Sequence, residues 1–455
     1  MRDLIEVILS QFSWLLNSRM VEYYVMNQWV KLPSSWQVAL KNMEPEDCVC
    51  LLTRATPSRI VLPLSILCIK TIVNSLPSRE GVKSPSELAK ALGTNNVEQR
   101  DFEPLSSLNN VRRKLKMKKE YEVDRVVAAT SLLKGSAECF NTIIDIGAGV
   151  GHLSRALAIA IPSCSIVAVE HNKELIEQSE RLNASLLSRD CGFIPPIHHC
   201  ESVQHDFHGY VVDTLRGDQK ALLIGLHPCG DLSASILRIF TRAPNVSAVM
   251  LFGCCYHKLS VNNGNEGDVS TQLGFPLSKK FGDIRLTPVA LDLACHGNEK
   301  YVDDLLTKSK SVYRCQCFRA LLEYIFVMND KTAVPEQRKK PVVHSVNPYE
   351  GITFEAYLRK ALSSSNPNAE EVIEMISDNP VIDVLKERVE EEWRRLLVVH
   401  CLRLMFAPIV EQLMIADRVE YIREHGHEAL VVPLFDPKIS SRNLTIFARK
   451  KTKCA

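Results

Sequence analysis

The chain contains 455 residues, of which 46% are hydrophobic and 24% charged, and it carries a net charge of +2. This composition is typical of a soluble globular protein, and the length predicts one large domain with a helical annex or two to three domains. The small net charge excludes a protein that coats nucleic acid with its whole surface, although it leaves room for a local basic patch.

The cysteine content and the N-terminus indicate the compartment. Fifteen cysteines in a chain of this size are too sparse, and too often inside apolar runs, for a disulfide scaffold. The first residues include Asp3 and Glu6, where a secretory signal peptide would be uncharged. We therefore expect an intracellular protein, cytoplasmic or nuclear, with free thiols.

Residues 1–110 are expected to form a helical N-terminal region. Apolar side chains recur at helical spacing from Leu4 to Leu16. The region passes into NNVRRKLKMKKE, in which six of twelve residues are Arg or Lys. Such a run is either the solvated face of a helix or a patch that faces phosphates beside an active site. The second interpretation makes Lys118 and Lys119 candidate substrate-binding residues.

From residue 141, short apolar runs alternate with helical segments. TIIDIG, SIVAVE, ALLIGLH and VSAVMLFG show no polar alternation, the pattern of parallel strands buried on both faces. Helices predicted over 152–161 and 173–188 complete repeated βαβ units. We expect the first part of an α/β core at 111–260 and an insertion with helices and a flexible loop at 261–380. The core would then close at 381–455 with a helix and two strands, ALVVPLFD and NLTIFARKK.

Residues 393–416 are apolar enough to raise the question of a membrane span. Arg403 and Glu411 interrupt this stretch, and its longest uncharged run, 404–410, has only seven residues. A bilayer span needs roughly 18 such residues. We therefore expect no membrane span and predict one long, mostly buried helix over 383–425.

The stretch IIDIGAGVGHLSRALA carries the most informative pattern in the chain. A strand ends at Asp145, a loop contains Gly147, Gly149 and Gly151, and a helix follows. Glycines allow a tight turn and the close approach of a ligand, beside a helix N-terminus that favours an anion. A dinucleotide-binding loop would have its third glycine at position 152, where this chain has histidine.

This pattern resembles motif I of the class I S-adenosylmethionine methyltransferases. The resemblance implies that the loop approaches the methionine part of the cofactor, and that Glu170 accepts hydrogen bonds from the ribose hydroxyls. An acid at this position also serves NAD enzymes, so Glu170 alone does not discriminate. Asp206 either contacts the adenine edge or caps a turn. The implied fold is an α/β, Rossmann-like doubly wound sheet with an antiparallel last strand, plus the N-terminal helical region and a helical insertion after strand five.

The segment LHPCGDLS follows the fourth predicted strand. It departs from the Asn/Asp-Pro-Pro-Tyr/Phe motif of amino-methylating enzymes. Its Pro228-Cys229 pair leaves open a cytosine-5 RNA methyltransferase with Cys229 as the nucleophile, whereas small buried thiols packed under a cofactor are the plainer interpretation. His227 is a candidate catalytic residue because a histidine can accept a proton from the methyl acceptor at neutral pH.

The segment FGCCYHKLS follows the fifth predicted strand. It has no second ligand pair at zinc spacing nearby, so we expect no metal and interpret this run as a wall of the acceptor pocket. His257 is the second catalytic candidate, or alternatively a supporting residue held by hydrogen bonds. Cys254, Tyr256 and Lys258 are candidate substrate contacts, with Tyr256 stacking on a flat acceptor and Lys258 meeting a phosphate or carboxylate.

The whole set of motifs resembles a narrower group, the methyltransferase-like 25 family, and most closely its 25B branch. The resemblance is carried by KKEYEV, DIGAGVGHLSRALA, HPCGDLS, GCCYHKLS, GFPLS, FRALLE and SSRNL. It implies the fold and S-adenosyl-L-methionine as cofactor, and it indicates the substrate less firmly. We expect methyl transfer to a macromolecule, with RNA slightly favoured over protein. A non-catalytic cofactor-binding scaffold and a nicotinamide oxidoreductase are the alternatives.

Overall fold

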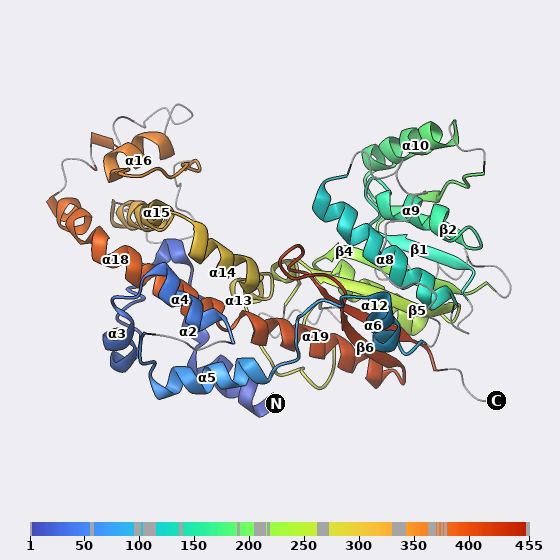
Figure 1. Cartoon of the computed structure of the whole chain (residues 1–455), viewed down its shortest axis with the longest axis horizontal. Helices are drawn as coiled ribbons and strands as arrows, with labels where there is room; N and C mark the ends of the chain where they lie inside the picture. The colour runs from blue at the N-terminus through green and yellow to red at the C-terminus, as the bar shows by residue number, and fades with distance from the viewer. Residues whose placement is uncertain are drawn as a thin grey trace, which may run out of the picture. The chain divides into compact units, whose positions relative to one another are not determined.

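The computed structural model describes residues 2–54, 59–94, 102, 115–135, 140–188, 192–203, 215, 219–261, 273–329, 343–362, 370, 373–374, 376 and 380–451. The chain divides into two compact units (Figure 1), each built from two separate segments. Unit 1 comprises Met1–Leu76 and Asn298–Ile409, and unit 2 comprises Pro77–Gly297 and Val410–Ala455. These divisions do not coincide with the boundaries expected at residues 110, 260 and 380.

Unit 1 is helical in the part of the chain that the structure describes. Its elements are α1 (Arg2–Gln11), α2 (Ser13–Leu16), η1 (Met20–Glu22), α3 (Ser34–Leu40), α4 (Pro45–Leu52), α5 (Leu64–Ser75), α14 (Asn298–Thr307), α15 (Lys310–Asn329), α16 (Phe354–Ala361) and α18 (Pro380–Leu404). Its two chain segments share a core in which the Phe12 ring stacks on Trp36 and lies 5.1 Å from the Phe406 ring, centroid to centroid. The helical N-terminal region expected from the sequence therefore packs with helices from the later half of the chain.

Unit 2 contains a seven-stranded sheet in the order β3-β2-β1-β4-β5-β7-β6. The strands are β1 (Thr142–Ile146), β2 (Ser165–Glu170), β3 (Ile197–Cys200), β4 (Ala221–Cys229), β5 (Val246–Cys254), β6 (Glu428–Pro433) and β7 (Leu444–Arg449). Neighbours from β3 to β5 pair parallel, whereas β7 pairs antiparallel with both β5 and β6. The sheet thus has the order and the antiparallel last strand of the class I methyltransferase fold, and the predicted fold class is confirmed.

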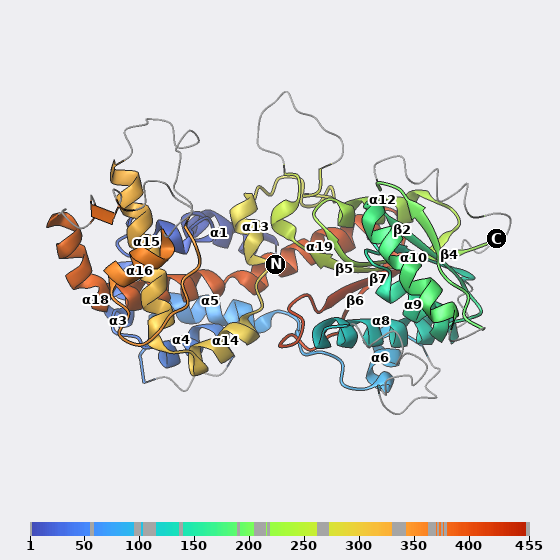
Figure 2. The same ribbon diagram turned by 90° about the horizontal axis from the view of Figure 1, so that it is seen from above.

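Helices cover both faces of the sheet (Figures 1 and 2). They are α6 (Pro85–Leu92), α8 (Met117–Gly135), α9 (His152–Ala160), α10 (Lys173–Leu187), α12 (Leu232–Arg242) and α19 (Ala407–Glu424). Helix α13 (Pro288–Leu293) packs against the short helix η3 (Tyr256–Lys258), which follows β5. Successive strand residues point to opposite faces, so Ile143 packs with α6, α8 and α9. Its neighbour Ile144 packs with α12 and α19. Because both faces are buried, the strands read as continuous apolar runs.

The prediction of one continuous helix over residues 383–425 is wrong, because the structure has two helices there. A turn at Met405 and Phe406 separates α18 from α19, and Pro408 is the second residue of α19. Proline lacks the N–H that a continuous helix would need at this position. The stretch Asp383–Glu424 has the length and hydropathy of a membrane-crossing helix, but 83% of its most apolar window is buried inside the protein, as in a core helix.

Candidate active site

The glycine loop joins β1 to α9 with three left-handed backbone conformations, at Gly147 (φ 75°), Gly149 (φ 58°) and Gly151 (φ 71°). The Gly147 N–H donates to the Val169 carbonyl oxygen over 2.9 Å, which holds the loop against the end of β2. A Cβ on Gly149 would point into open space, with no atom within 4 Å. The loop therefore leaves room for a ligand at Gly149.

Gly151 has a different role from Gly149. A Cβ on Gly151 would lie only 2.5 Å from the Ser179 Oγ of α10. The glycine is thus required by the packing of the loop on α10, and its backbone faces protein at this point. Helix packing of this kind is one of the reasons for which glycine-rich loops contain several glycines.

Glu170 ends β2 with its carboxylate buried at 6% exposure. Its Oε2 accepts from the Gly149 N–H at 2.9 Å, and its Oε1 accepts from the His171 and Asn172 N–H groups at 3.0 Å each. The carboxylate therefore ties the turn after β2 to the glycine loop. Because each oxygen has two acceptor positions, Oε2 retains capacity for a hydroxyl donor from a ligand in the loop.

Asp145 is buried more completely than Glu170. Its side chain is 2% exposed, and its Oδ2 accepts from the Ser154 hydroxyl at 2.6 Å. Burial raises the pKa of Asp145 to about 6, even though the Ser154 hydrogen bond lowers it. Its observed contact holds the first turn of α9. Asp206, the other acid predicted at the cofactor, lies outside the described residues.

A buried arginine behind the loop was missed by the sequence analysis. Arg155 donates to the Ser179 Oγ at 2.9 Å, to the Val150 carbonyl oxygen at 2.8 Å and to the His152 Nδ1 at 3.2 Å. Burial, Arg155 and Lys119 together lower the pKa of His152 to about 4, so this imidazole is neutral at pH 7. Because an arginine only donates, His152 accepts at Nδ1 and carries its proton on Nε2. His152 occupies the position at which a dinucleotide-binding loop has its third glycine, so this loop differs from that pattern.

His227 lies near the carboxyl end of β4 and adopts a φ of 65°, which a residue with a Cβ rarely holds. Its Nε2 lies 3.0 Å from the Oε2 of Glu122 on α8. Glu122 is 1% exposed, and its other oxygen accepts from the Ser440 hydroxyl at 2.7 Å and lies 3.6 Å from the Lys118 Nζ. The structure thus connects two residues predicted from the sequence, His227 and Lys118, through a carboxylate that was not predicted.

The charge of Glu122 is maintained by these neighbours. Burial alone would raise its pKa, but the hydrogen bond and charge of His227, with help from Ser440 and Lys118, hold the pKa below the usual value. The carboxylate is therefore ionised at neutral pH and orients the His227 ring. An oriented imidazole beside a carboxylate is an arrangement that can accept a proton from a substrate.

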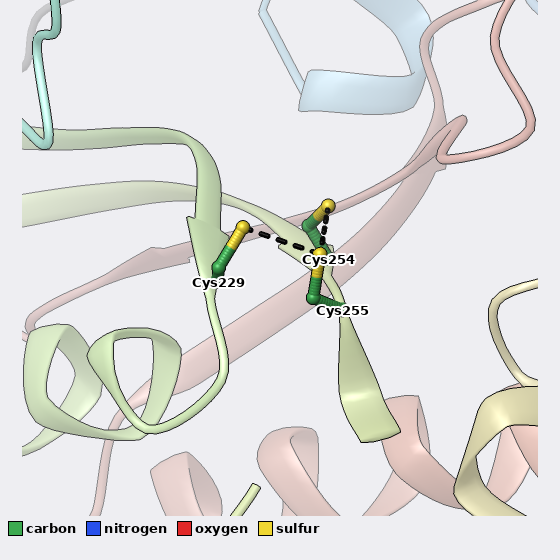
Figure 3. Close-up of side chains that lie close together, drawn as sticks. All are labelled: Cys229, Cys254 and Cys255. Carbon is green, nitrogen blue, oxygen red and sulfur yellow. Dashed lines mark hydrogen bonds between the residues drawn. The ribbon is translucent and has the colours of Figure 1, made fainter. Parts of the chain in front are cut away.

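Three thiols meet at the ends of β4 and β5 (Figure 3). The Cys255 Sγ lies 3.2 Å from the Cys229 Sγ and 3.5 Å from the Cys254 Sγ. Burial and the Cys255 thiol raise the pKa of Cys229 and raise that of Cys254 to about 12. A cysteine nucleophile needs a thiolate, so these shifts disfavour the cytosine-5 mechanism with Cys229.

The remaining predicted residues after β5 occupy different environments. Tyr256 is 2% exposed and its ring lies against Gly253, so it supports the turn from inside the protein and does not present its ring to an acceptor. The His257 Nδ1 lies 3.5 Å from the Cys295 Sγ and 3.6 Å from the Asp292 Oδ1. Lys258 is exposed, and its backbone lies against Gly230 in the turn that follows β4. His257 is thus held by neighbours, while Lys258 remains available to an acceptor.

Buried polar contacts connect the other quoted motifs to this edge of the sheet. In HPCGDLS, the Asp231 Oδ1 accepts from the Ser260 N–H at 2.8 Å. In GFPLS, the N–H groups of Leu277 and Ser278 donate to Asp417 on α19 at 3.0 and 2.9 Å. In SSRNL, Arg442 donates to the Cys295 carbonyl oxygen. The motifs thus hold the segments after β4 and β5 in place.

Comparison with known proteins agrees with this geometry. Residues 118–262 match a family profile described as a methyltransferase domain. The matched part contains the glycine loop, Glu122, Glu170, His227 and the three thiols.

Two curated relatives carry the same name, "Probable methyltransferase-like protein 25". The Mus musculus protein is 27% identical over 281 residues, which cover 60% of this chain and 44% of the relative. The Homo sapiens protein is 27% identical over 288 residues, which cover 62% of this chain and 45% of the relative. The resemblance to this group is confirmed, whereas the 25B branch stays an expectation. The matched region spans less than half the length of either relative.

One solved structure with a detected likeness is the plantazolicin methyltransferase BpumL in complex with SAH. It is 11% identical, covers 58% of this chain and 80% of its own, and has a TM-score of 0.22. A TM-score this low carries no weight for the fold or ligand of this chain. The fold assignment therefore rests on the strand order and on the methyltransferase domain.

Proposed function

We propose that the protein is an S-adenosylmethionine-dependent methyltransferase with RNA as its acceptor. The observation that carries this proposal is the placement of an open glycine loop and an oriented histidine at the carboxyl ends of neighbouring strands. In an open α/β sheet, ligands bind at this edge. Gly149 follows β1, Glu170 ends β2, and His227 lies near the carboxyl end of β4, the other neighbour of β1.

The residues present fit the cofactor. Gly149 has open space where a Cβ would point, so a ligand can approach its backbone. Glu170 lies 2.9 Å from the Gly149 N–H and offers an acceptor for ribose hydroxyls. Bound in the loop, the sulfonium cofactor would supply an electrophilic methyl group. The chain's own part is to bind and orient the two reactants.

His227 is proposed to take the proton of the acceptor. Its hydrogen bond to Glu122, at 3.0 Å, fixes the orientation of the ring. Ser440 and Lys118 hold Glu122 in turn. A positioned proton acceptor of this kind contributes roughly 10² to 10⁴ in rate. No cysteine nucleophile is required, so Cys229→Ser is expected to retain substantial activity.

RNA is favoured over protein by the basic residues at the start of α8. Lys116 and Lys118 are exposed there, and Lys118 is also 3.6 Å from Glu122. Lys258 contributes a further exposed cation beside the end of β5. Cations near a reactive edge attract a phosphate backbone and make its affinity depend on salt.

Transfer of a labelled methyl group tests this proposal. The purified protein is incubated with S-adenosylmethionine and separate RNA and protein fractions of a cell extract. We expect the label in RNA. Lys116→Gln should transfer less label than the wild type at raised salt. The control Lys173→Gln, which alters an exposed lysine on α10, should change the transfer little. Label in the protein fraction alone would assign a protein acceptor. No transfer to either fraction, with the cofactor bound, would support a non-catalytic scaffold.

A further inference from the structure

The three thiols of Cys229, Cys254 and Cys255 form a compact cluster that the proposed methyl transfer does not use. Cys229 and Cys254 are register partners on the neighbouring parallel strands β4 and β5. Cys255 follows directly, and its sulfur contacts the sulfurs of both other cysteines (Figure 3). All three sulfur atoms lie within 4.8 Å of one another. The cluster therefore arises from strand pairing, which the spacing in sequence does not reveal.

The sulfur geometry is close to that of a metal site. With Zn–S bonds of about 2.3 Å, tetrahedral coordination places two sulfurs about 3.8 Å apart. The observed separations are 3.2 Å for Cys229 to Cys255 and 3.5 Å for Cys254 to Cys255. Small side-chain movements would convert one arrangement into the other.

The backbone at Cys255 is also unusual. It adopts a φ of 47°, in the left-handed region that favours glycine. A Cβ disfavours this conformation, and such strain gathers at functional sites. At Cys255 this conformation accompanies the placement of its thiol near both neighbours.

We propose that Cys229, Cys254 and Cys255 bind one thiophilic divalent cation, and that Zn²⁺ is the ion best matched to this ligand set. Cysteine thiolates are soft ligands that select Zn²⁺ over Mg²⁺ or Ca²⁺. Binding would displace the thiol protons, so that three thiols and Zn²⁺ give a Zn–S₃ group of charge −1 and three released protons. Three protein ligands leave a fourth position for water or a substrate atom, as in catalytic zinc sites.

Nearby charges are suited to this anionic group. Burial raises the pKa of Cys229 and of Cys254. The charge of Lys258 lowers the pKa of Cys229, and the charge of Arg442 lowers that of Cys254. The two cations would balance the charge of the metal–thiolate group. They also stabilise the thiolates that the metal requires.

A second cluster nearby provides the competing location. His257, Asp292 and Cys295 also place their ligand atoms within 4.8 Å of one another. Asp292 is paired with both His257 and His296, at 3.6 and 3.1 Å. These contacts of Asp292 account for that group without a metal. The three-thiol cluster is joined only by hydrogen bonds between thiols, which are weak donors and acceptors, and it is the one we assign.

The test is metal binding by the full-length protein, prepared under reducing conditions and stripped of metal. Zn²⁺ is titrated in competition with a chromophoric chelator, and Co²⁺ is used in parallel because its thiolate charge-transfer absorption reports the number of sulfur ligands. We expect one equivalent of tightly bound Zn²⁺, release of protons, and a Co²⁺ spectrum indicating three thiolates.

Variants locate the ion. Cys229→Ser, Cys254→Ser and Cys255→Ser should each weaken binding by at least about tenfold, since loss of even a residue that supports a metal ligand lowers affinity on that scale. Cys68→Ser and Cys200→Ser alter exposed cysteines elsewhere and should change nothing. The proposal is overturned if the reduced protein binds no Zn²⁺ or if the Co²⁺ spectrum of the wild type lacks thiolate bands. It is also overturned if Asp292→Asn abolishes binding while the three serine variants retain it. None of these measurements depends on methyltransferase activity, so their failure would leave the proposed function standing.

Discussion

His227 and Glu122 show how single residues define the proposed reaction. The two side chains are 105 positions apart in sequence, yet their Nε2 and Oε2 atoms lie 3.0 Å apart. The left-handed backbone of His227 turns the chain at the point where its ring meets α8. Because Glu122 is buried and ionised, it can orient the ring without contacting the acceptor. Glu122 is therefore a positioning residue.

Replacing Glu122 tests this role. Glu122→Gln keeps the size of the side chain but removes the charge that holds His227, so turnover should fall by roughly 10- to 100-fold with unchanged cofactor affinity. The turnover of His227→Ala should fall at least as far as that of Glu122→Gln. Turnover and calorimetric affinity are measured for both, with Glu120→Gln, on the same helix, as the control. Normal turnover in both variants would place the proton acceptor elsewhere.

Asp145 provides a prediction about pH. Burial raises its pKa from 3.8 to about 6, so the folded state binds this proton more tightly than the unfolded state does. The wild type should therefore gain stability relative to Asp145→Asn as the pH falls through 6 toward 4. Linkage gives a gain of about 2 kcal/mol between pH 7 and pH 4.5. Denaturant unfolding of both proteins at these two pH values measures it, and a difference that does not vary with pH would contradict the burial of the charge.

At the scale of elements, α19 anchors the segment after β5 through one buried ion pair. Asp417 and Arg418 are 0% and 1% exposed in their side chains and lie 2.8 Å apart. Asp417 also receives the N–H groups of Leu277 and Ser278, and Arg418 donates to the Gly274 carbonyl oxygen. The GFPLS motif is thus held by α19 at several points.

Removing one partner of this pair should be costly. Asp417→Ala leaves the Arg418 charge buried and unpaired, and we expect a loss of about 3–5 kcal/mol in the free energy of unfolding. Glu428→Ala removes the partner of Arg449 on the surface, where the side chains are 48% and 42% exposed, and should cost less than about 1 kcal/mol. Chemical denaturation compares the two variants. Equal losses would mean that the buried pair does not anchor this segment.

The elements also show what the sequence could predict. The strands and the glycine loop were predictable because each is specified by a local pattern, such as the apolar run TIIDI and the three glycines that follow it. The contact of Ser440 with Glu122 spans 318 positions, and the meeting of Cys229 with Cys255 depends on the pairing of β4 with β5. No local pattern contains such contacts. The interpretation of Tyr256 as an acceptor contact likewise could not include its burial beneath Gly253, which is a property of the folded turn.

The whole molecule consists of two units that each need two segments of the chain. Unit 2 takes its last two strands and most of α19 from Val410–Ala455, while residues 298–409 belong to unit 1. The Asn298 side chain donates to the Leu404 carbonyl oxygen at 3.1 Å. The second segment of unit 1 therefore begins close to the place where it ends. A short connection can therefore replace the intervening segment.

A deletion tests this organisation. Residues 77–297 joined to 410–455 by a short Gly/Ser linker should fold cooperatively and bind S-adenosylmethionine, because the linker closes a short gap at little entropic cost. Residues 77–297 alone lack β6, β7 and α19 and should not give a cooperative unfolding transition. Circular dichroism and calorimetry distinguish the two fragments. A cooperative transition in the shorter fragment would contradict the division into units.

The most direct test of the account is calorimetric titration of S-adenosylmethionine into the wild type, Gly149→Val and Gly93→Val. Gly149 and Gly93 have φ values of 58° and 67°, and a Cβ on either meets no atom within 4 Å. Both valines should therefore cost similar stability, while only Gly149→Val places a side chain in the proposed ligand space. We predict that Gly149→Val loses at least about a hundredfold in affinity, or about 2.7 kcal/mol, whereas Gly93→Val binds like the wild type. Equal affinity in all three proteins, or no binding by the wild type, would contradict the central claim that this loop holds the methyl donor.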